Sequence, residues 1–243
     1  MRIKLDNVTI LGIDCIDPNR LKDVMDLCQR QIDFVDTKIL SSVEINDSRF
    51  VRIPRISSFE ELSIFCLRDL VKYVDTEYVL LVQWDGFILN PESWSKDFLN
   101  YDYIGSPWLV KDWSINDFDF PESLRGERVV GNGGFCIRSK KFLEISSKLF
   151  NQGLIRRNHP EDIAISVWYR DLFEQNGIKF APAKMAQRFA FEGRDDEYSI
   201  QFGFHGFYTN LDGWFKENPD FPNIYKNYIE YKNKKIIQWK PNK

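Results

Sequence analysis

Apolar residues in the first half of the chain fall into short groups with two alternating spacings. Residues 8–13 (VTILGI), 34–40 (FVDTKIL) and 78–83 (YVLLVQ) are apolar-rich runs of the kind found in buried strands. Between them, residues 18–28 and 58–73 repeat apolar positions at helical spacing. Alternating strands and helices are typical of a parallel sheet with helices on both faces. The pattern therefore predicts an α/β domain with a mainly parallel central sheet flanked by helices.

The second half is less regular. Residues 101–108 (YDYIGSPW) predict a short strand and turn, and residues 109–128, which have no apolar period, predict a long loop. Residues 128–139 (RVVGNGGFCIRS) predict strand segments around a glycine-rich turn, and residues 159–177 (HPEDIAISVWYRDLFEQNG) predict the clearest helix. Residues 178–192 are expected to be extended. No linker or internal repeat divides the chain.

Composition narrows the class of protein. The chain has 243 residues, of which 43% are hydrophobic, and a net charge of −3. This is enough for one α/β domain with a sizeable core, and the charge argues against a nucleic-acid partner. Neither a secretory signal nor an apolar run of ~18 residues is present, so we expect a cytoplasmic protein without a membrane span. The cysteines lack a C-x-x-C pair and predict reduced thiols: Cys15, Cys28, Cys66 and Cys136.

The third predicted strand ends in a lone carboxylate, Asp85, followed by Gly86. In an open α/β sheet, ligands bind beyond the carboxyl ends of the strands, so an acid there can hold a divalent cation that neutralises a diphosphate. Gly86 would let a ligand or backbone approach closely. Asp-Gly is also a common turn pair, and this stretch alone favours the turn.

Residues 131–135 (GNGGF) are the second motif of interest. Asn132 and Gly133 are a hairpin signal, while Gly131 and Gly134 expose a backbone surface that a flat ligand could reach. The spacing matches neither the dinucleotide fingerprint nor the P-loop.

Two further motifs contain acids or histidine. Glu161 and Asp162 stand in a predicted first helical turn, where acids usually only complement the helix dipole, yet one of them can face a cleft as a base. His205 lies in FGFHGF between glycines and phenylalanines. Such a histidine is more often a satisfied core residue than a ligand, although neutral imidazole binds transition metals well.

Taken in order, the stretches QWDGF, YDYIGSPW, VGNGGFCIRS, HPEDI and FGFHG resemble a little-characterised family of GT-A fold glycosyltransferase-like proteins associated with bacterial polysaccharide genes. The resemblance runs from about Tyr78 to His205, and YDYIGSPW together with VGNGGF is its most specific part. It implies a single GT-A-like (Rossmann-like) domain over residues 1–243. Residues 1–100 would be the nucleotide-binding half, 101–210 the acceptor and catalytic half, and 211–243 a C-terminal extension.

The resemblance also implies a metal site. The Asp-x-Asp motif of such enzymes corresponds to Gln83-Trp84-Asp85, so only the last acid is present. Asp85 and the late His205 would hold Mn²⁺ or Mg²⁺, and Gln83 could contact the donor ribose. Trp84 and Gly86 would lie beside the donor. The lost first acid makes strict metal dependence an open question.

For catalysis, the resemblance implies that Asp162, or failing that Glu161, is the base of an inverting transfer. The backbone at Gly133 and Gly134 would lie near the transferred sugar. Trp108 and Trp113 could stack on sugar faces or simply pack locally.

The implied partners are a nucleotide-sugar donor and a glycan or lipid-linked glycan acceptor in cell-surface polysaccharide synthesis. A lipid-linked acceptor would place the protein at the inner face of the membrane. The basic tail could rest there, although a solvated C-terminus is the simpler interpretation; its lysines are Lys232, Lys234, Lys235, Lys240 and Lys243.

Two rival functions remain. A non-catalytic nucleotide-sugar or carbohydrate-binding domain of the same fold would explain the missing first acid. A phosphohydrolase would use Asp85 as a nucleophile, but that chemistry normally requires a second acid two residues later, where Phe87 stands.

Overall fold

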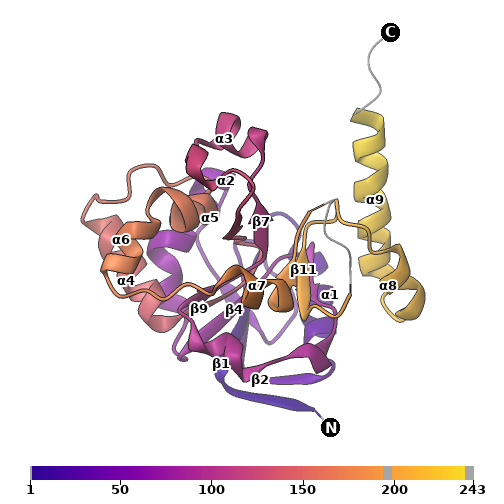
Figure 1. Ribbon diagram of the computed structural model, residues 1–243. Coiled ribbons are helices and arrows are strands. Elements are labelled where there is room, and N and C mark those ends of the chain that lie inside the picture. The colour runs from indigo at the N-terminus through magenta and orange to yellow at the C-terminus, as the bar shows by residue number, and fades with distance from the viewer. Residues whose placement is uncertain (1, 194–198, 239–243) are drawn as a thin grey trace.

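A six-stranded mixed sheet forms the centre of the computed structural model, which describes residues 2–193 and 199–238, the last four by backbone only (Figure 1). The three strands predicted from apolar runs are neighbours, and only β9 runs against the others. The prediction of a mainly parallel sheet flanked by helices is confirmed. In spatial order the strands are β3 (Phe50–Arg52), β2 (Ile32–Ser41), β1 (Ile3–Ile13), β4 (Tyr78–Val82), β9 (Phe135–Ser139) and β6 (Tyr103–Ile104).

Strand register brings three chain segments to one edge of this sheet. Gly12 of β1 pairs with Val82 of β4, and Val82 pairs with Phe135 of β9. Because β9 is antiparallel, its beginning lies beside the ends of β1 and β4. The turns after β1 and β4 and the glycine-rich loop before β9 therefore open at the same place, which we call the crevice edge.

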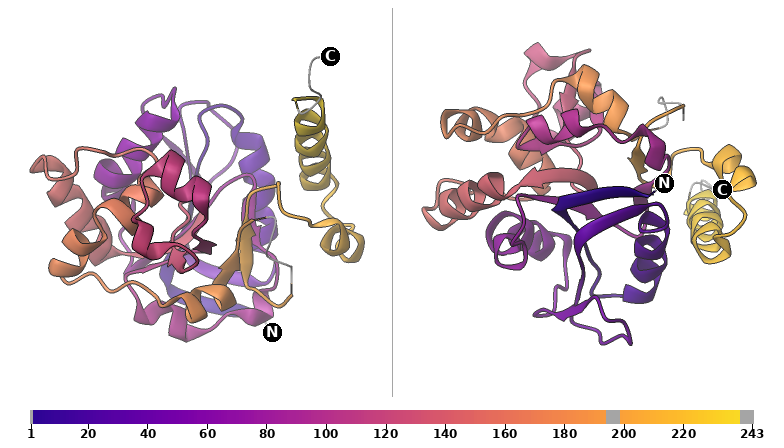
Figure 2. Two further views of the ribbon diagram at one scale, coloured as in Figure 1. Left: turned by 45° about the horizontal axis from the view of Figure 1, so that its top comes forward. Right: turned by 90° about the horizontal axis from the view of Figure 1, so that it is seen from below.

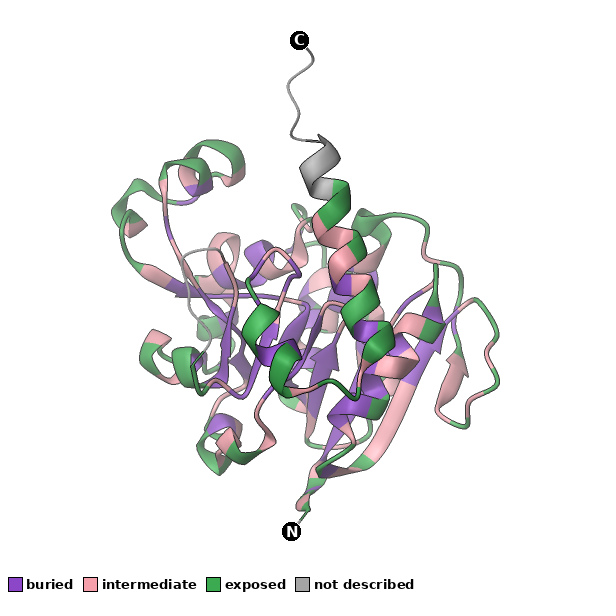
Figure 3. Ribbon diagram, turned by 90° about the vertical axis from the view of Figure 1, so that its right-hand side faces the viewer, coloured by how far each residue is buried: buried purple, intermediate pink, exposed green. Residues whose placement is uncertain are grey.

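Helices pack on the sheet with the apolar faces that their spacing predicts. Helix α1 (Pro18–Cys28) packs against β1 and β2 and is covered by α9 (Pro222–Gln238), as Figure 2 shows. Helix α4 (Lys140–Asn151) packs on β9 together with the π-helical turn Phe65–Asp69, which continues α2 (Phe59–Ile64). Strand β9 is buried throughout, β4 is buried from Val79 to Val82, and β1 is buried from Val8 to Gly12 (Figure 3). Short 3-10 turns lie at Leu70–Tyr73, Pro91–Ser93, Lys96–Asn100 and Glu122–Leu124.

The prediction of a long loop over residues 109–128 is wrong. Residues 107–130 form a flap that stands above the sheet in Figure 1, in which β7 (Pro107–Leu109) and β8 (Arg128–Val130) pair around α3 (Asp112–Phe118). A small apolar cluster separate from the main core stabilises the flap. Its helix has only seven residues, which is too short to produce a visible apolar period.

Two other predicted elements differ from the structure. Residues 178–192 contain α7 (Ala183–Phe189), where good helix formers follow Pro182, and only the short strand β10 (Ala190–Phe191) is extended. The predicted helix over 159–177 is divided into α5 (Glu161–Ile163), a π-helical turn Ala164–Trp168 and α6 (Arg170–Gln175). Within GNGGF, Asn132 has φ 72°, but no hairpin forms because β8 and β9 belong to different sheets.

A second sheet brings a late segment of the chain to the crevice edge. Strands β10, β11 (Gly203–His205) and β5 (Gly86–Ile88) form a three-stranded sheet in which His205 pairs with Gly86. Phe87 and Phe204 meet edge to face at 4.7 Å and fix the pairing of β5 with β11.

The C-terminal part forms α8 (Asp212–Glu217) and α9. Of the basic tail, Lys240 and Lys243 lie outside the described residues, and the side chain of Lys235 is not described. No helix within the described ranges combines the length and apolar character needed to cross a membrane.

Candidate functional site

Asp85 lies in a tight turn between β4 and β5. Gln83 and Gly86 exchange backbone hydrogen bonds of 3.1 and 3.0 Å across this turn. A Cβ atom on Gly86 would lie 2.9 Å from the carbonyl oxygen of Gly134 and 2.9 Å from the His205 ring. The glycine therefore permits a close approach that no other residue would. Asp85 and Gly86 therefore form a turn, and the same turn lies against the His205 ring.

The structure brings Asp85, His205 and Gln83 together. Asp85 Oδ1 lies 3.7 Å from His205 Nε2, and Gln83 Oε1 lies 3.1 Å from the same nitrogen. Burial raises the pKa of Asp85, and its buried Oδ1 has no hydrogen-bond partner within residues 2–193 and 199–238. A buried carboxylate oxygen without a hydrogen-bond partner is uncommon in folded proteins and is available to a ligand.

Asp85, His205 and Gln83 each offer a donor atom to a divalent cation. The described residues contain no group of three His, Cys, Asp or Glu side chains that could hold a metal ion. The amide oxygen of Gln83 supplies a third donor beside the carboxylate and imidazole. The two oxygens are ligands that Mn²⁺ or Mg²⁺ accepts when ligand oxygens complete the shell, whereas the imidazole is more typical of a transition metal, so the set fits Mn²⁺ better than Mg²⁺. The three side chains therefore fit a cation held jointly with a bound ligand.

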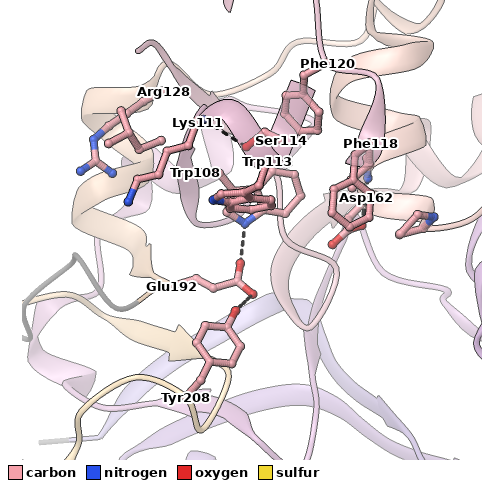
Figure 4. Close-up of a pocket in the computed structure, with 14 residues that line it drawn as sticks. Trp108, Lys111, Trp113, Ser114, Phe118, Phe120, Arg128, Asp162, Glu192 and Tyr208 are labelled. Carbon is pink, nitrogen blue, oxygen red and sulfur yellow. Dashed lines mark hydrogen bonds between the residues drawn. The ribbon is translucent and has the colours of Figure 1, made fainter. Parts of the chain in front are cut away.

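Glu192, which the sequence reasoning missed, is the hub of this site. Its carboxylate accepts hydrogen bonds from His205 Nδ1 at 2.7 Å, Trp108 Nε1 at 2.5 Å and the Tyr208 hydroxyl at 2.5 Å; Figure 4 shows the last two. Burial raises the pKa of Glu192, but the charge of His205 and the three hydrogen bonds outweigh this effect. The pKa is lowered overall, so the carboxylate is ionised. An acid on Nδ1 orients the imidazole and leaves Nε2 facing Asp85 and Gln83.

Burial also lowers the pKa of His205, but the charges of Glu192 and Asp85 outweigh it and raise that pKa to about 9. Without a cation, the imidazolium therefore neutralises part of the acid cluster. A bound cation would take over this role, since a metal ligand must lose its proton.

The two neighbouring acids at the start of α5 point to different partners. Asp162 accepts hydrogen bonds from the backbone N–H of Gly133 at 3.2 Å and of Ile163 at 2.9 Å. Glu161 instead accepts one from Arg138 Nη2 at 3.1 Å, and Arg138 is fully buried. Burial, with the charge of Glu161 as the second cause, raises the pKa of Asp162 to about 7.

The glycine-rich loop fits closely against these side chains. A Cβ atom on Gly133 would lie 2.2 Å from Glu161 Oε1, one on Gly134 2.1 Å from His205 Nε2, and one on Gly131 2.1 Å from the Trp108 ring. The interpretation of Gly131 and Gly134 as a surface for a flat ligand is therefore wrong, because the protein's own rings occupy that space.

A cavity of about 690 Å³ lies under the flap, with Asp162 and Glu192 in its wall (Figure 4). Its other walls are largely aromatic and include Trp108, Trp113 and Phe118. This volume is in the range of small-molecule sites, and mainly apolar and aromatic walls with a few polar groups are the usual lining of such sites. Trp84, like Gln83, Asp85 and His205, does not line this cavity; it lies beneath Arg20 at the crevice edge.

Comparisons with known proteins agree with this architecture. A family model described as a protein of unknown function (DUF5672) matches residues 44–205. Among the curated proteins, no relative matches. Among solved structures, the chain is similar to an active-site mutant of LgtC, with 11% identity over 90% of this chain and 95% of that chain and a TM-score of 0.52.

The chain is also similar to the galactosyltransferase LgtC in complex with donor and acceptor sugar analogs, with 12% identity over 81% and 86% of the two chains and a TM-score of 0.48. A glycosyltransferase involved in the glycosylation of the major capsid of PBCV-1 shows 13% identity over 86% and 97%, with a TM-score of 0.48. The conclusion about the fold rests on the LgtC mutant with its TM-score of 0.52, and at 11% identity this likeness shows the fold alone. The predicted GT-A-like fold is confirmed.

Proposed function

This chain belongs to the family of proteins of unknown function DUF5672, and we propose that it is a glycosyltransferase that moves a sugar from a nucleotide-sugar to a glycan acceptor. The observation that carries the proposal is Asp162, a carboxylate with a pKa of about 7 in the wall of an aromatic cavity. A general base works best when its pKa lies near the working pH. The Asp85–His205 pair and the GT-A-like fold support the same function.

On the donor side, Asp85, His205 and Gln83 would hold Mn²⁺ or Mg²⁺, as their donor atoms allow. When bound, the cation would offset the negative charge that builds on the leaving diphosphate. Glu192 holds the His205 ring in place. Gly86 and Gly134 have no side chains and so let the backbone lie close to the His205 ring.

On the acceptor side, a sugar would enter the cavity under the flap and stack on Trp108 or Trp113, whose rings line it. Asp162 would take the proton from the attacking hydroxyl, which is the role of the base in an inverting transfer. Glu161 is held by Arg138, so it keeps the guanidinium paired rather than reaching the acceptor. A glycan or lipid-linked glycan of a cell-surface polysaccharide is the acceptor class that we propose.

One observation favours a second candidate, a non-catalytic domain that binds the nucleotide-sugar. Gln83 stands where an acid would strengthen the metal site, and a weaker site suits binding without turnover. Release of free sugar from a bound nucleotide-sugar would decide for the enzyme.

The test is a thermal-shift screen of nucleotide-sugars with and without Mn²⁺, followed by assays of sugar release and transfer. A ligand that binds only the native state raises the melting temperature. We expect one donor to stabilise the protein in a Mn²⁺-dependent manner. Asp85→Asn, which keeps the shape and removes the charge, should lose most of the metal effect. Equal donor binding in EDTA would remove the metal from the proposal.

A further inference from the structure

Arg20 is a cation at the crevice edge that neither the proposed metal site nor the proposed base uses. It lies in the first turn of α1, directly after the turn that follows β1. Its Nε donates to Asp14 Oδ2 at 2.7 Å. Asp14 Oδ1 in turn accepts the backbone N–H groups of Ile16 and Asp17 at 2.9 Å each. The carboxylate that anchors Arg20 is therefore itself satisfied by fixed donors.

The plane of the guanidinium is also fixed. Arg20 Cζ lies 4.2 Å from the centroid of the Trp84 ring, which is a stacking distance for arginine on an aromatic face. Trp84 in turn packs against Phe207, at 5.3 Å between ring centroids, and against Tyr231 at 6.3 Å. The stack therefore belongs to the folded core around the site and not to a mobile surface side chain.

The outer edge of this guanidinium is available for a ligand. Within residues 2–193 and 199–238, the two terminal amino groups of Arg20 make no hydrogen bond, and the side chain is 23% exposed. Arg20 also lies near Asp85: burial raises the pKa of that carboxyl, and the positive charge of Arg20 is among the effects that lower it. A guanidinium fixed on one edge and open on the other is preorganised for a planar or tetrahedral oxyanion.

We propose that Arg20 binds the diphosphate of the donor, with its two terminal amino groups on phosphate oxygens beside the site of Asp85. This inference rests on the proposed function and names the group that receives the diphosphate. It also explains how the site can work with a single acid at Asp85, since a fixed guanidinium supplies positive charge where the second acid would have strengthened cation binding. Arg138 cannot take this part, because it is fully buried and pairs with Glu161.

The experiment is isothermal titration calorimetry with inorganic pyrophosphate in EDTA, on the full chain. Arg20→Gln should weaken pyrophosphate binding at least ~10-fold, the low end for the loss of hydrogen bonds to a charged group. Arg30→Gln is a matched control, because Arg30 also pairs with an aspartate, Asp220 at 2.9 Å, and stacks on an aromatic ring, Phe221 at 5.2 Å. It should bind pyrophosphate within ~2-fold of the parent protein.

Arg20→Lys serves as a second variant that keeps the charge and loses the fork, and we expect it to bind with intermediate affinity. Equal affinity in the parent protein, Arg20→Gln and Arg20→Lys would overturn the proposal, and so would an equal loss in Arg30→Gln. The proposed function fails separately: pyrophosphate binding that depends on Arg20, in a protein that uses no nucleotide-sugar, would keep this anion site and remove the transferase. An unchanged KM for the donor in Arg20→Gln would keep the transferase and remove the anion site at Arg20.

Discussion

The two halves of this protein share one apolar core but differ in the polar contacts that lie beside it. Up to residue 88, long apolar strands and the helices α1 and α2 contribute to this core, and few polar groups lie inside it. From residue 101 onward, aromatic and aliphatic side chains contribute to the same core, and polar contacts between residues far apart in the chain connect the elements around the site. Glu192 ties the flap to β11 through Trp108 and His205, and Arg138 ties β9 to α5 through Glu161.

Stability and chemistry are therefore expected to depend on different residues. In the first half, removing a side chain should cost packing energy, with little effect on chemistry away from the crevice edge. In the second half, changing one polar atom should alter the site while most of the core remains. Substitutions in each half test this difference.

The largest effect is expected at Asp162. Asp162→Asn keeps the size of the side chain and removes the base, so the rate of sugar transfer should fall at least ~100-fold with donor binding intact. Steady-state kinetics and donor titration measure the two quantities separately. Asp171→Asn, an exposed acid of α6, is the control. Transfer at the parent rate would pass the role to Glu161 or remove a protein base altogether.

A smaller effect is expected at Glu192. Glu192→Gln cannot hold the His205 imidazole as a carboxylate does, and loss of such a partner typically weakens metal affinity by ~10–100-fold. Mn²⁺ titration followed by tryptophan fluorescence checks this and also reports on Trp108, which donates to the same carboxylate. Glu174→Gln, at an exposed acid that pairs with Arg170, should leave Mn²⁺ affinity unchanged. Equal Mn²⁺ affinities in both variants would contradict the role of Glu192.

The first half is tested at Ile39, a fully buried residue of β2. Ile39→Val should lower the free energy of unfolding by about 0.5–1.5 kcal/mol, because one methylene leaves the core. The transfer rate per folded molecule should stay at the parent value. Urea denaturation and kinetics on the same preparation check both, and a transfer rate reduced as strongly as in Asp162→Asn would abolish the distinction between the halves.

The last prediction concerns pH. The pKa of Asp162 is raised by burial, from 3.8 to about 7, so the folded state holds this proton more tightly than the unfolded state. The contribution of Asp162 to stability is therefore greatest at low pH and is lost as the pH rises through about 7. Asp162→Asn carries no charge and should melt above the parent protein at pH 8, with a smaller difference at pH 5. A melting difference independent of pH would contradict the raised pKa.

Much of the first half could be predicted from sequence, because its strands are apolar runs and the segments between them repeat apolar positions at helical spacing. The order of the strands does not follow the chain, since β4 pairs with β1 and β9. Asp85 and His205 could be singled out since each stands beside a glycine at an abrupt change of pattern. Glu192 could not, because its partner Trp108 lies 84 positions away and nothing around Glu192 marks it as polar and buried. The same holds for Arg20, whose significance depends on Trp84 lying beneath it.

The flap is inserted between two paired strands of the main sheet. Strands β6 and β9 are antiparallel neighbours, with Ile104 paired to Ile137, so the whole flap is a connection between two adjacent strands. The sheet closes the ends of this connection regardless of what lies between them, and doubling the length of such a loop costs only ~0.6 kcal/mol of closure entropy. The length of the flap between Leu109 and Arg128 can therefore change without breaking the pairing of β6 with β9. Trp108, at the base of the flap, limits such exchange, because its indole donates to Glu192, which also accepts from His205.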